Sequence, residues 1–144
     1  MAKRILYVED HLNNMLLLKR IVQAEGHEFL HAKDAAAGWQ AAVACRPDLI
    51  FLDLRLPGPV DGLGLLRRLK ADPATGQIPV IVLTAYGDWE NEQRARAAGS
   101  DDFLAKPADI HHIRLAIRTH TGTPAGPPRP LPLSHWAYDL IHGA

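Results

Sequence analysis

Side chains suited to phosphate chemistry follow four of the short apolar runs in this chain. They are Glu9 and Asp10 after residues 5–8, Asp53 after residues 49–52, Thr84 after residues 80–83, and Lys106 after residues 103–105. Three carboxylates held together repel one another unless they share a cation. Carboxylate oxygens suit Mg²⁺ better than they suit zinc or copper. We therefore expect these residues to meet around Mg²⁺.

The same residues supply what a phosphoryl transfer needs. Mg²⁺ draws in a phosphoryl group and neutralises the charge that develops during its transfer, and one carboxylate acts as the nucleophile. Lys106 supplies a compact positive charge, the Thr84 hydroxyl donates to a phosphoryl oxygen, and the small Ala85 leaves room for access. A lone aspartate after a strand is usually structural or solvated. The combination in this order points to a phosphoryl site.

The apolar runs alternate with helical patterns five times between residues 4 and 120, which predicts buried parallel strands. We predict strands over 4–9 and 28–32 and three more that end at Asp53, Thr84 and Lys106. In an open parallel α/β sheet, ligands bind outside the carboxyl ends of the strands. This topology would bring the chemistry-bearing residues to one edge of the sheet.

Helices are predicted between these strands by apolar stripes and by capping residues. The stripes are Leu12, Met15, Leu16, Ile21 and Val22 within 11–25; Trp39, Ala42 and Val43; Leu63, Leu66 and Leu69; and Ile110, Ile113 and Ile117. Asp34 and Asp88 are suitable N-caps, and Gly26 and Gly99 suit helix ends.

The helix expected over residues 89–98 differs from the others. It offers Trp89 and several alanines but no stripe of large aliphatic side chains. Such a helix buries little apolar area, so it should be held weakly. Its place just after Thr84 makes it a candidate for a switch.

Composition limits the function classes. The chain has 144 residues, of which 47% are hydrophobic, and a formal net charge of zero, which predicts one folded domain without a basic nucleic-acid surface. No apolar stretch is long enough for a membrane span or a signal peptide, so we expect a cytoplasmic protein. The single Cys45 is expected to be a small buried hydrophobe. His27 and His31 lie too far apart along an extended segment to share a metal, and we treat the histidines as incidental.

Composition changes beyond residue 120. Residues 121–134 are rich in proline and glycine, which predicts an extended tether between a domain over 1–120 and a short segment over 135–144. Trp136, Tyr138, Leu140 and Ile141 allow that segment to dock on a partner or on the domain itself. A frayed end is the alternative.

Four segments make the chain resemble the receiver domain of bacterial response regulators, which has the flavodoxin-like CheY-type fold. They are ILYVED (5–10), PDLIFLDLRLP (47–57), IPVIVLTA (78–85) and GSDDFLAKP (99–107). The resemblance implies an α/β fold with a doubly wound five-stranded parallel sheet of order 2-1-3-4-5 and five flanking helices. It covers about residues 3–120.

The resemblance also implies roles for individual residues. Asp53 would accept a phosphoryl group from the phosphohistidine of a sensor histidine kinase or a histidine phosphotransfer protein. Glu9, Asp10, Asp53 and the backbone carbonyl of Arg55 would hold Mg²⁺, for which Mn²⁺ can substitute. Thr84, Ala85 and Lys106 would bind the phosphoryl group, and the peptide bond before Pro107 would be cis.

The resemblance also implies how phosphorylation would be passed on to a partner protein. Thr84 would move toward the phosphoryl group while Phe103, which replaces the commoner tyrosine, turns inward. The output surface for a downstream protein would be the face over residues 88–120. Arg55 and Tyr86 occupy positions that tune hydrolysis of the aspartyl phosphate, and their bulk predicts a long-lived phosphoryl state.

Several functional readings remain open at this point. The first is a stand-alone receiver that is not an enzyme, either a monomer or a phosphorylation-dependent homodimer. The second is the receiver of a longer regulator whose effector domain is absent here. The third, an aspartyl-phosphate phosphohydrolase, is disfavoured because Arg55 stands where such an enzyme usually carries a second aspartate.

Overall fold

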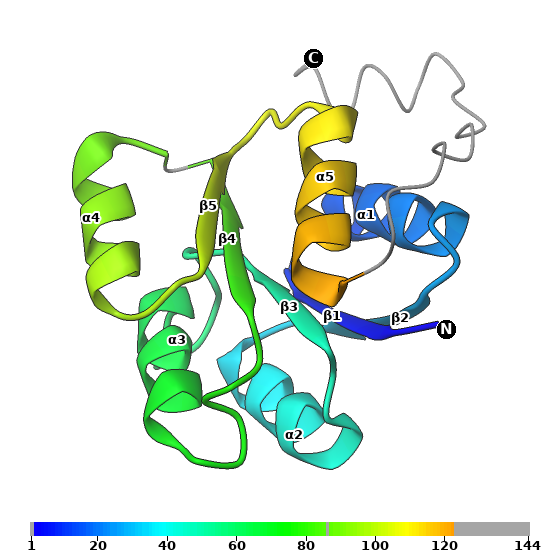
Figure 1. Ribbon diagram of the computed structural model, residues 1–144. Coiled ribbons are helices and arrows are strands. Elements are labelled where there is room, and N and C mark those ends of the chain that lie inside the picture. Colours follow the sequence, from blue (N-terminus) through cyan, green and yellow to red (C-terminus); the bar gives the residue numbers. More distant parts are fainter. Residues whose placement is uncertain (1, 86, 123–144) are drawn as a thin grey trace.

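The computed structural model describes residues 2–85 and 87–122 as five strands alternating with five helices (Figure 1). The elements are β1 (Arg4–Val8), α1 (Leu12–Ala24), β2 (Glu28–Ala32), α2 (Ala35–Cys45), β3 (Leu49–Leu52), α3 (Gly62–Ala71), β4 (Val80–Thr84), α4 (Trp89–Ala97), β5 (Asp102–Ala105) and α5 (Ile110–Thr121). Tyr86, the predicted tether beyond Gly122 and the segment 135–144 lie outside the described residues.

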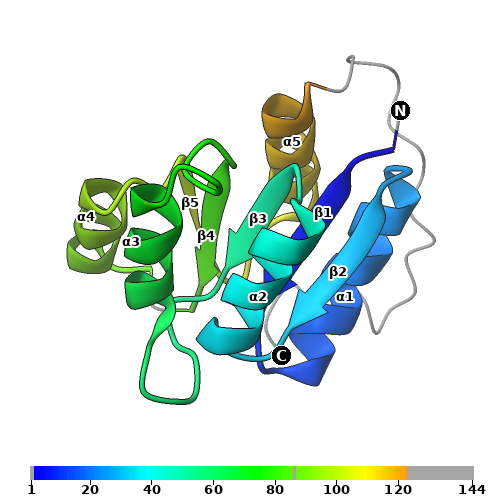
Figure 2. The same ribbon diagram turned by 90° about the horizontal axis from the view of Figure 1, so that it is seen from below.

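The strands form one parallel sheet of order β2-β1-β3-β4-β5, so the predicted doubly wound topology is confirmed. Helices α1 and α5 cover one face of this sheet, and α2, α3 and α4 cover the other (Figures 1 and 2). Val8 pairs with Leu52, and Leu52 with Val82. This register brings the carboxyl ends of the three central strands level with one another.

Two apolar cores, one on each face of the sheet, explain why the sequences of the central strands are hydrophobic throughout. One core joins the sheet to α2, α3 and α4, and the other joins it to α1 and α5. Residues 5–8, 49–52 and 80–83 are all buried, as expected for strands covered on both faces. The rigid centre of the sheet therefore holds the strand ends that carry the polar side chains.

Helix α1 presents a different face to the core from the one that we predicted. Its buried side chains are Leu18, Ile21 and Val22, whereas Leu12 is 63% exposed and Leu16 is 39% exposed. The period of 3.6 residues, centred on Leu18 and Val22, turns Leu12 and Leu16 toward solvent. The predicted stripe was wrong at these two positions.

Two residues of α2 also differ from expectation. Val43 is exposed, because the α2 face centred on buried Ala35, Gly38 and Ala42 turns it away from the sheet, and Cys45, at the helix end, is only half-buried. The predicted caps are confirmed, since the Asp34 side chain accepts from the Ala37 N–H and the Asp88 side chain accepts from the Asn91 N–H.

Helix α4 is weakly anchored, as its sequence predicted. Ala95 is its buried residue, and Trp89 is 76% exposed. Its two ion pairs, Glu90–Arg94 and Glu92–Arg96, lie along the surface of the helix. Over residues 2–85 and 87–122, no helix is long and apolar enough to cross a membrane.

Candidate functional site

Asp53 is held at the end of β3 by its backbone. Its N–H donates to the Val8 carbonyl (3.1 Å), and the residue is only 7% exposed. Gly62, at the start of α3, packs directly against this backbone and donates its N–H to the Leu54 carbonyl (2.9 Å). A Cβ at Gly62 would contact the Asp53 carbonyl oxygen and lie 2.6 Å from the Leu54 Cα. The Asp61-Gly62 turn thus fixes the position of the Asp53 carboxylate.

Both carboxylate oxygens of Asp53 accept hydrogen bonds. The Thr84 hydroxyl donates to Oδ1 (2.9 Å), and the Arg55 N–H donates to the same oxygen (3.1 Å). The Lys106 ammonium donates to Oδ2 (3.1 Å). The sheet therefore gathers Asp53, Thr84 and Lys106 from three different strand ends, as the sequence predicted.

Glu9 is the most deeply buried acid of the site. Its Oε2 accepts from the Tyr7 hydroxyl (3.1 Å) and from the Lys106 ammonium (2.9 Å), and its Oε1 accepts from the His11 N–H (3.1 Å). Asn14 contributes a longer contact to Oε1 (3.5 Å). Lys106 consequently bridges Glu9 and Asp53, and it is the cation that compensates two neighbouring carboxylates.

Burial and these contacts shift three pKa values. Burial raises the pKa of Glu9, a hydrogen bond with the Asp53 carboxyl raises it further, and Lys106 only partly opposes the rise. Burial alone would raise the pKa of Asp53. Its bonds with Glu9, with Lys106 and with the Arg55 N–H outweigh that effect, and the net pKa is lowered. The pKa of Tyr7 is raised by burial and by the adjacent Glu9 and Asp53 charges. Asp53 is thus the acid of this pair that favours the ionised, nucleophilic form.

Asp10 and Arg55 lie on the open side of the site, where both are exposed. Together with Glu9, Asp53 and Lys106 they line a cavity of about 480 Å³. No cluster of three or more His, Cys, Asp or Glu side chains within the described ranges is arranged to hold a metal ion. Glu9 is turned toward Lys106 and Tyr7, away from the arrangement expected of a ligand. The ligand set stays a prediction.

The remaining predicted residues within the described ranges take different places around the site. Ala85 is exposed at its rim, and the Lys106 N–H donates to the Thr84 carbonyl (2.8 Å). The Lys106–Pro107 peptide bond is cis. Phe103 is 8% exposed and belongs to the core beneath α4, so its ring is inward.

Two contributors to the site were missed in the sequence. The Tyr7 hydroxyl contacts Glu9, although Tyr7 reads as one more buried strand residue. The His31 Nε2 lies 2.6 Å from the Glu9 carbonyl oxygen, which identifies it as the donor to that oxygen. We had treated the histidines as incidental, yet strand pairing in the sheet places His31 beside Tyr7. Only the pairing of β1 with β2 reveals this contact.

Comparisons with known proteins agree with this geometry. The family model for the response regulator receiver domain matches residues 5–118. The polar-differentiation response regulator DivK of Brucella anthropi is 33% identical over 122 residues, which is 85% of this chain and 98% of that protein. The sporulation initiation phosphotransferase F of Bacillus subtilis is 33% identical over 120 residues, or 83% of this chain and 94% of that protein.

A solved structure provides a further comparison. The receiver domain of the sensor histidine kinase PA1611 of Pseudomonas aeruginosa is 27% identical, with a TM-score of 0.78, and the match covers 85% of this chain and all (100%) of that one. That structure was determined with a magnesium ion in its active-site cleft. The chain therefore belongs to the family of response regulator receiver domains. Receiver domains are signalling phosphoacceptors of two-component systems rather than conventional enzymes, and they interact with histidine kinases or phosphotransfer proteins.

Proposed function

We propose that this chain accepts a phosphoryl group on Asp53 from the phosphohistidine of a sensor histidine kinase or a histidine phosphotransfer protein. The observation that carries the proposal is the placement of Asp53, with Thr84 on one carboxylate oxygen and Lys106 on the other. A strand-end aspartate with only a structural role has no need of both partners.

In the proposed transfer, an Asp53 carboxylate oxygen forms a bond to phosphorus as the phosphorus–nitrogen bond of the donor breaks. The donor imidazole keeps the bonding electron pair and takes up a proton. Lys106 stabilises the charge on the transferred group, and the Thr84 hydroxyl donates to one of its oxygens. Because the pKa of Asp53 is lowered, its carboxylate is already ionised at neutral pH.

The donor chemistry of the cavity fits a hard divalent cation. Asp10, Asp53 and the Arg55 carbonyl supply oxygen ligands on its open side, and the buried Glu9 lies behind them. These residues would hold Mg²⁺, or Mn²⁺ in its place, since both prefer oxygen ligands. The cation, when bound, neutralises charge on the phosphoryl oxygens.

The proposed output runs through the face over residues 88–120, which includes the weakly anchored α4. Thr84 and Phe103 connect the phosphoryl site to this face, and a downstream protein would read it, with the chain as a monomer or as a phosphorylation-dependent homodimer. The bulk of Arg55 and Tyr86 favours slow hydrolysis of the aspartyl phosphate. A cytoplasmic location is part of this proposal, since histidine kinases present their phosphohistidine there.

The test is the intact mass of the protein after incubation with phosphoramidate and Mg²⁺. We expect a gain of one phosphoryl group that Asp53→Asn abolishes. Asp48→Asn is the matched control, because Asp48 is exposed beside the start of β3, at the opposite edge of the sheet. A folded protein that gains no phosphoryl group, or an equal gain in Asp53→Asn, would refute the proposal.

A further inference from the structure

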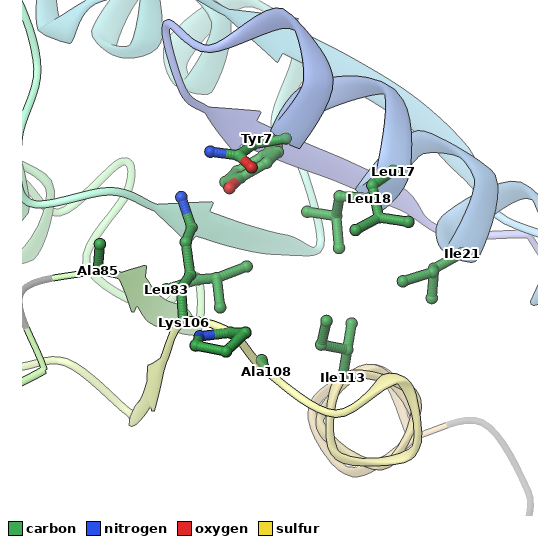
Figure 3. A pocket seen from close by; sticks show the side chains of 11 residues that line it. Tyr7, Leu17, Leu18, Ile21, Leu83, Ala85, Lys106, Ala108 and Ile113 are labelled. Carbon is green, nitrogen blue, oxygen red and sulfur yellow. The ribbon is translucent and has the colours of Figure 1, made fainter. Parts of the chain in front are cut away.

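A second cavity, of about 280 Å³, lies between α1 and α5 (Figure 3). Leu17, Leu18 and Ile21 of α1 face Ile113 of α5 across it, and Leu83 of β4 forms part of its floor (Figure 3). We call this cavity the α1–α5 groove. Its wall is mostly aliphatic, which favours an apolar occupant over water.

The groove adjoins the phosphoryl site. Asn14, Ala85 and Lys106 line both cavities, so an occupant of the groove would lie beside the Lys106 side chain that binds Asp53. At this end the groove also meets Tyr7, whose hydroxyl is already bonded to Glu9. The polar groups of this end thus serve the site, and the aliphatic remainder is open to a bulky side chain.

The size of the groove suits an aromatic anchor. A cavity of about 150 Å³ lined by aliphatic side chains is enough to hold benzene. The α1–α5 groove is larger (about 280 Å³) and therefore has room for an indole ring. A tryptophan buries roughly 150–250 Å² on entering such a site, which makes it a strong contributor to binding.

The chain itself carries a segment of this chemistry. Residues 135–144 include Trp136, Ala137, Leu140 and Ile141, whose spacing places them on one face of a helix. His135, Tyr138 and Asp139 fall on the remaining faces. The segment is therefore amphipathic, with one large aromatic residue at the start of its apolar face.

The tether is long enough to deliver this segment. The chain leaves α5 at Gly122, and α5 begins at Ile110, about 18 Å back along the helix at 1.5 Å per residue, with Ala108 of the groove just before it. Residues 123–134 span up to about 37 Å in the extended form that proline favours, at roughly 3.1 Å per residue. A tether of this length keeps the segment at a high effective concentration, on the order of millimolar.

We propose that residues 135–144 fold back and dock in the α1–α5 groove of the same chain, with Trp136 as the anchor. This docking does not rest on the proposed function.

The test uses NMR spectra of the full-length chain without any phosphodonor. We expect nuclear Overhauser contacts between the Trp136 indole and the methyl groups of Ile21 and Ile113, unchanged on tenfold dilution. Trp136→Ala/Leu140→Ala should move those methyl resonances, and His135→Ala/Asp139→Ala should leave them in place. Contacts that vanish on dilution would overturn the proposal in favour of a second copy. Absence of contacts at every concentration would overturn it outright.

A matched pair on α1 tests the groove from the other side. Leu17→Lys places a charge in the groove and should abolish the contacts of Trp136. Leu16→Lys adds the same charge one residue earlier, where the side chain is exposed and outside the groove, and should leave them intact. Equal effects of the two substitutions would contradict the proposal. Because no phosphoryl group is needed, this result is independent of whether Asp53 accepts one.

Discussion

Lys106→Met removes the ammonium that bridges Glu9 and Asp53, and we expect it to destabilise the fold when divalent cations are absent. Methionine keeps most of the aliphatic stem, so the substitution mainly deletes the charge and its hydrogen bonds. The two carboxylates that this ammonium contacts then remain with no cation to compensate them. The loss should appear in the free energy of unfolding, whatever the signalling role of the chain.

The expected magnitude follows from the burial of the three side chains. Lys106 is 17% exposed, Glu9 1% and Asp53 10%, and both contacts are 3.1 Å or shorter. Removing one partner of a buried ion pair costs about 3–5 kcal/mol, because a charge is left buried without compensation. We expect about 3 kcal/mol, since Glu9 can relieve part of the repulsion by retaining a proton.

The loss in the free energy of unfolding should depend on pH, because it depends on the ionisation of Glu9. Burial raises the pKa of Glu9 and Lys106 opposes the rise, so deleting Lys106 raises that pKa further. A carboxyl with a raised pKa in the folded state contributes its full stability below the unfolded pKa, and this stability is lost as pH increases through the folded pKa. The destabilisation by Lys106→Met should therefore be largest at neutral pH and shrink as the pH falls toward the ordinary glutamate range.

Urea unfolding in EDTA, repeated across this pH range, measures the effect. Arg94→Met is the matched control, because the Arg94 side chain is 59% exposed and its partner Glu90 is 70% exposed. An exposed ion pair contributes at most about 1 kcal/mol, so the control should lose little and show no comparable pH dependence. Equal losses in the two variants at neutral pH, or a Lys106→Met loss that does not shrink in acid, would refute the electrostatic reasoning.

Two further substitutions test the framework around the site. Gly62→Ala should cost about 2 kcal/mol in urea unfolding and slow phosphorylation of the neighbouring aspartate, because the new Cβ overlaps the backbone at Leu54. Gly64→Ala, whose Cβ meets no backbone and only the side chains of the exposed Val60 and of Asp61, should be neutral or stabilising, and an equal loss in both would exclude the backbone contact as the cause. His31→Ala should cost about 1 kcal/mol and weaken Mg²⁺ binding in a calorimetric titration, since the Glu9 carbonyl loses its donor. His31→Gln should restore part of both, and an unchanged Mg²⁺ affinity in His31→Ala would leave His31 with a packing role alone.

Most of the fold could be predicted because its signals are local. Runs such as residues 49–52 and 80–83 are apolar throughout, since both faces of a central parallel strand are covered. Caps such as Asp34 and Gly26 depend on backbone geometry that only a few residue types satisfy. The face of α1 could not be predicted as well, because leucines occur on several sides of that helix and only its packing against the sheet and α5 selects the ones that are buried.

The residues at the strand ends of the site could also be predicted from the sequence. Asp53 and Lys106 each follow a strand directly and Thr84 is the last residue of one, so the parallel α/β pattern alone places them together. The hydrogen-bond partners of Glu9 could not be predicted from the order of the strands. Its contact with Tyr7 depends on the direction of two side chains at the end of β1, and its contact with His31 depends on which strand lies beside β1. Such information is carried by the pairing of distant segments.

The charges at the site explain why a single phosphorylation would have consequences beyond it. Lys106 contacts two carboxylates at once, and burial still raises the pKa of Glu9 because this single ammonium only partly offsets it. A divalent cation would add the missing positive charge, and a phosphoryl group on Asp53 would draw the ammonium and the Thr84 hydroxyl toward itself. Thr84 lies at the end of β4, and the chain reaches α4 a few residues later. Since α4 buries little of its own surface, a small change in the position of Thr84 meets little resistance there.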